Sequence, residues 1–232
     1  MTGEKDTYYS EYYKKSQRTG FQGWGNSLID KIIEKKVVRF PGMKILEIGA
    51  SSGEHLDYVS VNPIWEEYVC LDLNPGVSNP IMFEKLSNKT SSKFSNLSFI
   101  RGDAEYLPFS DDKFDLVISA CLLAHVNNPE KVLIEMRRVV KSTGQIVIAM
   151  PSDPGILNRL VKLLITYPKM KRLGIQFPRL EYAREHRNCI SNLIELIKWT
   201  FRDDKFYFSF FPFRFRSWNS NLVVTLDCRV LK

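Results

Sequence analysis

The chain has 232 residues, of which 44% are hydrophobic and 25% are charged, a composition typical of one globular domain with a full core. The formal net charge of +7 favours either an anionic partner or a solvated basic surface. No apolar run approaches the roughly 20 residues of a membrane span, and the polar N-terminus lacks the apolar core of a signal peptide. Four scattered cysteines form no CxxC pair. We therefore expect a cytoplasmic protein without a metal site or a disulfide.

Strand and helix signals alternate along the middle of the chain, as in a parallel sheet that helices cover on both faces. Amphipathic patterns predict helices over residues 24–38, 53–60 and 129–140. Short apolar runs predict strands over residues 44–48, 68–71, 97–100, 114–119 and 145–150. Asn128 is a candidate N-cap of the third helix, Pro129 suits its first turn, and Gly144 follows its basic end.

The C-terminal third follows a different pattern. Residues 155–173 predict one basic amphipathic helix, or two helices broken at Pro168. The apolar side of this segment consists of Ile156, Leu157, Leu160, Leu163 and Leu164. A further helix is predicted over residues 188–201, and two alternating segments, 205–216 and 221–230, predict an antiparallel pair that closes the sheet.

These elements predict an α/β fold with a Rossmann-like, doubly wound sheet of seven strands, mostly parallel with an antiparallel last strand and helices on both faces. We expect a single domain over residues 1–232, with an N-terminal helical cap over 1–40 and an inserted helical lid over 151–187. Four tyrosines precede the first helix, Tyr8, Tyr9, Tyr12 and Tyr13. They belong either to a lid over a ligand or to a solvent-facing tail.

The most informative segment is the loop after the first predicted strand, from Gly49 to Gly53. Its two glycines allow a sharp turn and a close approach of the backbone to a ligand. Glu47 and Glu54 flank the loop, and carboxylates there are unsuited to a pyrophosphate, which is itself an anion. A cationic ligand fits better. The loop therefore points away from NAD and ATP and toward S-adenosylmethionine, which carries a sulfonium and an ammonium group.

Three further motifs follow this loop in order, and the four together resemble a class I S-adenosylmethionine-dependent methyltransferase over nearly the whole chain. The later motifs are Cys-Leu-Asp72, Arg-Gly-Asp103-Ala104 with its Leu-Pro-Phe109 continuation, and the strand that ends at Ser119 and Ala120. The chain departs from the family pattern at Ser51, where the middle glycine of the loop usually lies.

The resemblance implies a cofactor site made of Glu47, Gly49, Ala50, Ser51, Gly53, Asp72, Leu73, Asp103, Ala104, Ser119 and Ala120. In the family, the loop wraps the methionine part of S-adenosylmethionine, and its acid helps to orient the ammonium group. Asp72 lies about twenty residues beyond the loop, where an acid accepts hydrogen bonds from ribose hydroxyls. Asp103 and Ala104 match the adenine-binding position. Aspartate is also a common turn former, so a structural role stays open for Asp72 and Asp103.

The acceptor side is less defined. His125 lies behind the fourth predicted strand and could act as a base toward an acceptor hydroxyl, or could pack over the cofactor or cap a helix. Arg184, His186 and Arg187 are candidate ligands of an anionic acceptor such as the diphosphate of a nucleotide sugar, or else surface residues paired with nearby acids.

The C-terminal block resembles bacterial methyltransferases of surface-polysaccharide and modified-sugar pathways and, more distantly, phospholipid N-methyltransferases. This block consists of residues 182–188, the helix after them, residues 201–204, residues 211–214 and residues 217–219. We therefore expect methyl transfer to an O or N atom of a small molecule such as a sugar or nucleotide sugar, with lipid N-methylation as the alternative. The +7 charge suggests a rival of another class, an inactive methyltransferase-like module that binds RNA or protein. The phenylalanines of 206–215 alternate like a buried strand, which argues against nucleic acid as the partner. The basic stretch 159–172 is consistent with a lid, a peripheral membrane contact or a dimer surface.

Overall fold

The computed structural model describes residues 20–59, 65–75 and 96–232. The four N-terminal tyrosines, Tyr8, Tyr9, Tyr12 and Tyr13, and with them half of the expected helical cap, lie outside the described residues. None of the helices in the described part has the length and apolar character needed to cross a bilayer.

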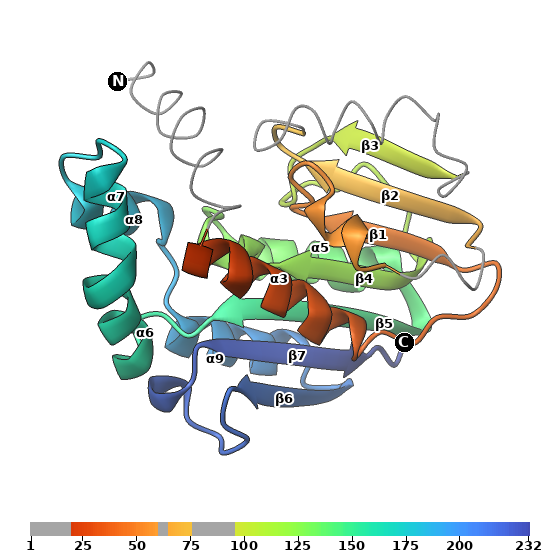
Figure 1. Ribbon diagram of the computed structural model, residues 1–232. Helices are drawn as coiled ribbons and strands as arrows, with labels where there is room; N and C mark the ends of the chain where they lie inside the picture. The colour runs from red at the N-terminus through yellow and green to blue at the C-terminus, as the bar shows by residue number, and fades with distance from the viewer. Residues whose placement is uncertain (1–19, 60–64, 76–95) are drawn as a thin grey trace.

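Seven strands form one sheet in the order β3-β2-β1-β4-β5-β7-β6 (Figure 1). The parallel strands are β1 (Lys44–Ile48), β2 (Glu67–Asp72), β3 (Leu97–Arg101), β4 (Phe114–Ala120) and β5 (Val140–Pro151). β7 (Val223–Arg229) pairs antiparallel with both β5 and β6 (Lys205–Phe211). The predicted fold class, with an antiparallel last strand, is confirmed.

β1, β2 and β4 are buried on both faces, which explains their short continuous apolar runs, whereas the edge strand β3 is fully buried only at Leu97. In β1, Leu46 and Ile48 join one core cluster while Ile45 joins the other. One face of the sheet is covered by α5 (Pro129–Val139) and α9 (Ile190–Thr200), and the other by α3 (Gly20–Glu34) (Figure 1). The strand order reverses between β1 and β4, so their carboxyl ends flank the point where open α/β sheets bind ligands.

The helix α5 begins as its sequence predicts. The Asn128 side chain accepts a hydrogen bond from Lys131 N at 3.0 Å, and Pro129 occupies the first turn. The prediction that Gly144 follows as a helix-ending glycine is wrong, because the chain turns extended at Val140 and Gly144 lies inside β5. A Cβ on Gly144 would lie 2.9 Å from Lys141 O, so this glycine serves a close backbone approach.

The helix predicted over residues 53–60 is also wrong for the described part of that range. Only a short 3₁₀ helix forms there, Glu54–Asp57, with Gly53 before it in the left-handed conformation. His55 and Leu56 are both buried, so this short turn seals the interior instead of presenting an amphipathic surface.

The segment after β5 forms a lobe of helices that we call the lid lobe, residues 156–185. It contains α6 (Ile156–Val161), a π-helical turn (Lys162–Thr166), α7 (Tyr167–Arg172) and α8 (Pro178–Glu185). Pro168 does not break the helix, because Tyr167 N already bonds to Lys162 O five residues back and the wider turn precedes the proline. Figure 1 shows the lid lobe beyond the carboxyl end of β5.

Candidate cofactor and acceptor site

The loop after β1 has the sharp geometry that its glycines predict. Gly49, Ser51 and Gly53 all have left-handed backbone angles, with φ of 76°, 54° and 81°. Ser51 therefore adopts the conformation usually reserved for glycine, and a hydrogen bond of 2.9 Å from its N–H to Asp72 Oδ2 supports it. A Cβ on Gly49 would lie 3.1 Å from the Leu122 side chain, so the loop packs closely against the segment after β4.

Asp72 connects this loop to the neighbouring strand ends. Its Oδ2 accepts from Ser51 N, its Oδ1 accepts from Asn74 N at 2.8 Å, and its carbonyl accepts from Gly102 N at 3.0 Å. A carboxylate has about four acceptor positions, so two remain for ligand hydroxyls. The turn-forming and ligand-binding roles are therefore compatible in one side chain. Leu73 follows with 59% of its side chain exposed.

The loop after β3 is shaped by Asp103. Its Oδ1 accepts from Glu105 N at 2.9 Å, which is the turn that the Gly-Asp sequence predicts. Ala104 is buried at the base of this turn, and Glu105 accepts in turn from Asn128 N at 2.8 Å. The loop is therefore held to the start of α5, with Asp103 facing solvent.

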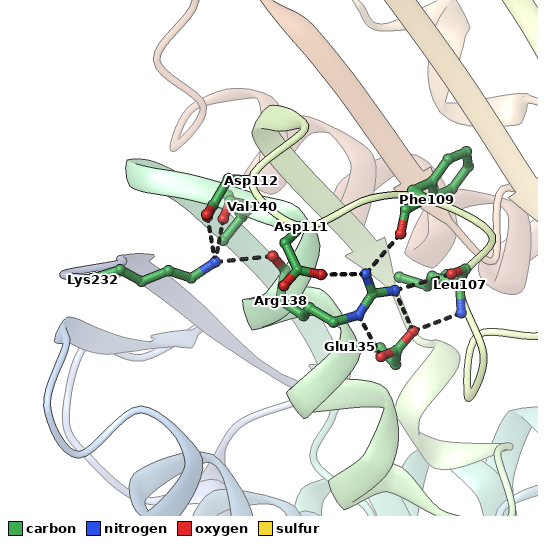
Figure 2. A network of polar contacts seen from close by, with 8 residues as sticks. All are labelled: Leu107, Phe109, Asp111, Asp112, Glu135, Arg138, Val140 and Lys232. Atoms are coloured by element: carbon green, nitrogen blue, oxygen red, sulfur yellow. Dashed lines mark hydrogen bonds and ion pairs between the residues drawn. The ribbon is translucent and has the colours of Figure 1, made fainter.

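Arg138 of α5 clamps the rest of the same loop (Figure 2). Its guanidinium donates to Leu107 O at 3.0 Å, to Phe109 O at 2.7 Å and to Asp111 Oδ1 at 2.8 Å. Glu135 receives two more of its bonds and accepts from Leu107 N at 2.8 Å. The hydrogen bonds from Arg138 lower the pKa of Glu135 and keep it ionised. Three bonds from Arg138 and one from Leu107 N to Glu135 thus fix the segment that follows the predicted adenine position.

A buried ionic cluster lies behind the glycine loop, and Glu47 is part of it. Glu47 Oε2 accepts from the Tyr68 hydroxyl at 2.7 Å and lies 3.2 Å from His55 Nδ1. The other ring nitrogen of His55 lies 3.0 Å from Glu34 Oε1, and Arg39 binds Glu34 with both terminal nitrogens. The structure thus ties the acid of the first motif to α3 through His55.

The charges of this cluster follow from its burial. Burial alone would lower the pKa of His55, but the carboxylates of Glu47 and Glu34 outweigh it and raise the pKa to about 10. His55 is therefore an imidazolium between two acids. Burial also raises the pKa of the nearby Asp30 to about 7. Neither His55 nor Tyr68 is predicted as a site residue. A tyrosine within an apolar strand and a histidine directly after the loop do, however, indicate buried polar contacts.

The end of β4 meets the loop directly. Ser119 pairs in register with Ile48, the last residue of β1, and Ala120 pairs with Ala149 of β5. The Ser119 hydroxyl is fully buried and finds no hydrogen-bond partner among the described residues. Cys121 has a left-handed backbone, and burial raises the pKa of its thiol to about 12, so it is no nucleophile.

Under the lid lobe, polar side chains gather at the carboxyl ends of β4 and β5. His125 Nδ1 lies 3.0 Å from Glu185 O, and its ring contacts the His186 ring edge-on at 4.7 Å. His186 stacks on Tyr182 at 4.0 Å, and its Nδ1 lies 3.7 Å from Asp153 Oδ2. Burial lowers the pKa of both histidines, that of His186 to about 2, so both rings are neutral.

Of the three predicted acceptor ligands, only His186 joins this buried group. Arg184 pairs with Glu181 at 2.9 Å on the exposed side of α8. Arg187 bonds to the Asn127 side chain and, at 3.0 Å, to Arg184 O. Arg184 thus pairs within α8, whereas Arg187 connects the end of the lid lobe to the segment after β4. Within the described ranges, no group of three or more acidic, histidine or cysteine side chains is arranged to hold a metal ion.

Three features suit a nucleoside ligand: a tight backbone loop, the Asp72 carboxylate with acceptor positions beyond its two backbone bonds, and the buried Ser119 hydroxyl. Comparisons with known proteins concern the class of protein. Residues 46–148 match the family model described as a methyltransferase domain. The chain is 32% identical to the demethylmenaquinone methyltransferase of Renibacterium salmoninarum over 53% of this chain and 48% of that protein. It is 33% identical to the ubiquinone/menaquinone biosynthesis C-methyltransferase UbiE of Vibrio cholerae over 57% and 52%. The chain thus spans about half the length of these relatives.

The whole fold also has known counterparts. A methyltransferase from Haloferax volcanii, solved in complex with the Trm112 methyltransferase activator, superposes with a TM-score of 0.64 over 98% of this chain and 97% of that chain, at 16% identity. An S-adenosylmethionine-dependent methyltransferase from Aquifex aeolicus gives 0.60 over 97% and 98%, at 14% identity. These likenesses concern the fold alone. The family match shows a methyltransferase domain over residues 46–148, and the solved structures show that the chain as a whole has the fold of S-adenosylmethionine-dependent methyltransferases.

Proposed function

We propose that this chain is an active methyltransferase that binds S-adenosylmethionine at the carboxyl ends of β1, β2 and β4 and methylates a small molecule. When bound, the cofactor would supply a methyl group attached to a positively charged sulfonium sulfur, and loss of that methyl group would leave a neutral thioether. Gly49 and Ser51 would surround its methionine part, Asp72 its ribose, and Asp103 with Ala104 its adenine. The observation that supports this best is the Asp72 carboxylate, which orders the glycine loop and keeps acceptor positions for hydroxyls.

The chain also offers a base for the acceptor. His125 Nδ1 lies at hydrogen-bond distance from a carbonyl, which can only accept, so Nδ1 carries the proton and Nε2 keeps its lone pair. Burial lowers the pKa of His125, so this lone pair is available at neutral pH. His125 N donates to Leu122 O at 2.9 Å, and Leu122 packs on Gly49, so the ring lies one turn from the cofactor loop.

A base is useful when the acceptor must lose a proton as the new bond forms. The curated relatives are named for methylation of demethylmenaquinone and for C-methylation in ubiquinone and menaquinone biosynthesis. We therefore favour a hydroxylated, lipophilic ring as the acceptor class. Loss of its hydroxyl proton to His125 would make a ring carbon or the oxygen nucleophilic.

The nucleotide sugar expected from the sequence stays a prediction. Arg184 and Arg187, its expected ligands, are engaged with Glu181 and Asn127, so binding of a diphosphate would have to replace these contacts. Lipid N-methylation likewise stays an alternative, as does the inactive RNA- or protein-binding module. An amine acceptor needs to arrive unprotonated but does not need His125.

The variant His125→Gln tests the base. We expect kcat toward a soluble naphthoquinol to fall by about 10²- to 10⁴-fold, because proton transfer by a positioned side chain contributes about that much. The dissociation constant of S-adenosylmethionine should change less than about twofold. A phosphatidylethanolamine and a nucleotide sugar serve as parallel acceptors. Activity on the nucleotide sugar alone would contradict a lipophilic ring as the acceptor but would agree with methyl transfer. An unchanged kcat in His125→Gln would show that His125 is not the base.

A further inference from the structure

The lid lobe exposes an unusual amount of apolar surface. Ten of the eighteen large apolar side chains that are exposed in the described part of the chain lie in residues 156–180 or 213–215. They include Ile156 (63% exposed), Leu164 (74%), Phe177 (64%) and Phe215 (54%). Scattered exposed apolar residues are normal, but a concentration of exposed apolar side chains on one lobe indicates a surface that binds a protein, a ligand or a membrane.

Charge on the same surface is predominantly positive, and the only acids of the lid lobe, Glu181 and Glu185, lie in α8, where Glu181 pairs with Arg184. Residues 154–180 contain six Lys or Arg and no Asp or Glu. Lys162 is buried and paired with Asp153, whereas Arg159, Lys171, Arg172 and Arg179 are exposed. The neighbouring segment 212–216 adds Arg214 and Arg216, again without an acid. The partner must therefore be both apolar and negatively charged.

An apolar recess adds to this surface. Ile156, Leu157 and Leu160 of α6 face Phe213 and the turn before β7 across a shallow pocket of about 230 Å³. Its lining is mostly apolar, and it opens toward solvent between the lid lobe and the loop after β6. Such a recess suits an acyl chain better than a charged peptide.

A second copy of the chain is a poor fit. A two-fold interface places the same patch on both subunits, so each exposed cation of this surface would meet the same set of cations. With no acid in residues 154–180, the patch cannot pair its own charges across such an interface. An anionic lipid bilayer supplies both components that the surface needs, negatively charged headgroups for its cations and an apolar interior for its apolar side chains.

We propose that the exposed face of the lid lobe, with residues 213–216, docks on anionic lipid membranes. Apolar side chains such as Leu164 and Phe177 enter the interfacial region, while Arg159, Lys171 and Arg172 contact the headgroups. The docking itself does not depend on the proposed methyl transfer.

Cosedimentation of the full chain with vesicles tests the proposal. We expect binding to vesicles of equal parts phosphatidylcholine and phosphatidylglycerol, and little binding to phosphatidylcholine alone. Raising the salt to about 1 M, where the Debye length is about 3 Å, should remove most of the binding. The double variant Lys171→Glu with Arg172→Glu should weaken it by about tenfold or more, because each basic residue near an anionic surface contributes substantially.

The matched control carries the same change of charge elsewhere: Lys35→Glu with Lys205→Glu, two exposed lysines of other elements. We expect it to bind nearly as the wild type does. Leu164→Ser with Phe177→Ser should also weaken binding, whereas Trp199→Ser with Tyr207→Ser, equally exposed but outside the lobe, should not. The proposal is overturned if the wild type does not bind anionic vesicles, or if the control variants and the lobe variants bind them equally. It is also overturned if light scattering shows a dimer of the wild type that dissociates in Leu164→Ser.

Discussion

Each of the three histidines of the chain lies in its own electrostatic setting. Burial disfavours the charged form of all three, but only His55 faces two carboxylates, which raise its pKa to about 10. His186 faces the ammonium of Lys162 and the ring of His125, and its pKa falls to about 2. The same residue type therefore serves as a fixed cation behind the cofactor loop and as a neutral ring on the acceptor side.

This contrast predicts three separate titrations. In a protein labelled at its histidine rings, we expect the His55 ring to stay protonated up to about pH 9. The rings of His125 and His186 should still be neutral at pH values just below 6.5, the usual pKa of histidine. Single His→Gln variants assign the three signals by NMR. Three rings that titrate together near pH 6.5 would contradict the buried cluster and the neutral base alike.

Stability should follow the same pKa values. The folded-state pKa of His55 lies above its unfolded value of 6.5, so its stabilisation is complete below pH 6.5 and is lost as the pH rises toward 10. Asp30, with a pKa near 7, adds to this loss up to about pH 8, and the raised pKa values of the buried Cys70, Cys121 and Tyr68 add to it from about pH 8 upward. The free energy of unfolding in urea should therefore decline between pH 7 and pH 9. His55→Gln should flatten that decline.

At the residue scale, the sequence predicts the positions of the site better than the roles. Asp72 and Asp103 lie at adjacent strand ends as their spacing predicts. Each also forms the turn that was the structural alternative, because one carboxylate can do both. Glu47 is bound by Tyr68 and His55, partners from separate segments that no local pattern reveals.

Among the elements, α5 has the most far-reaching contacts. From this one helix, Arg138 holds the carbonyls of Leu107 and Phe109 together with Asp111, so one side chain makes three of the hydrogen bonds of the loop after β3 (Figure 2). Close by, Lys232 Nζ donates to Val140 O and Asp112 Oδ1, both at 2.7 Å, which fixes the last residue of the chain to the same corner.

We expect Arg138→Met to lower the free energy of unfolding by about 2–3 kcal/mol, because it leaves two carbonyls and Glu135 without their donor. The affinity for S-adenosylmethionine should also fall, since the loop carries Asp103 and Ala104. Urea denaturation and calorimetry measure the two effects. Arg184→Met, which removes one exposed pair with Glu181, is the matched control and should cost less than about 1 kcal/mol. Equal losses in both variants would refute the clamp.

The elements that the sequence predicts best are those buried on both faces. The predicted strand over 44–48 coincides with β1, and the Asn128 cap fixes the start of α5, because each depends on local residues alone. The errors arise where distant contacts decide. Residues 53–60 form only a short 3₁₀ helix in the described part, where His55 takes part in the ionic cluster. Of the two alternatives for residues 155–173, the structure has the continuous helical segment, which passes Pro168 through a π turn.

At the scale of the molecule, the two halves of the site have different origins. The proposed cofactor side is built from strand ends and short loops of the sheet, with Gly49, Asp72 and Asp103 as its expected residues. The proposed acceptor side lies between the sheet and the lid lobe, where His125, Tyr182 and His186 come from different segments of the chain. This division explains why the sequence identifies the methyl donor more readily than the acceptor.

The central claim is that the acid at the end of β2 helps to bind S-adenosylmethionine. Isothermal calorimetry of the wild type, Asp72→Ala and Asp203→Ala tests it most directly, since Asp203 is an exposed acid remote from the loop. We predict that the wild type binds the cofactor, that Asp203→Ala binds it equally well, and that Asp72→Ala loses about 10- to 100-fold in affinity, the value of a charged hydrogen bond. A wild type that does not bind S-adenosylmethionine, or two variants with the same affinity, would contradict the account.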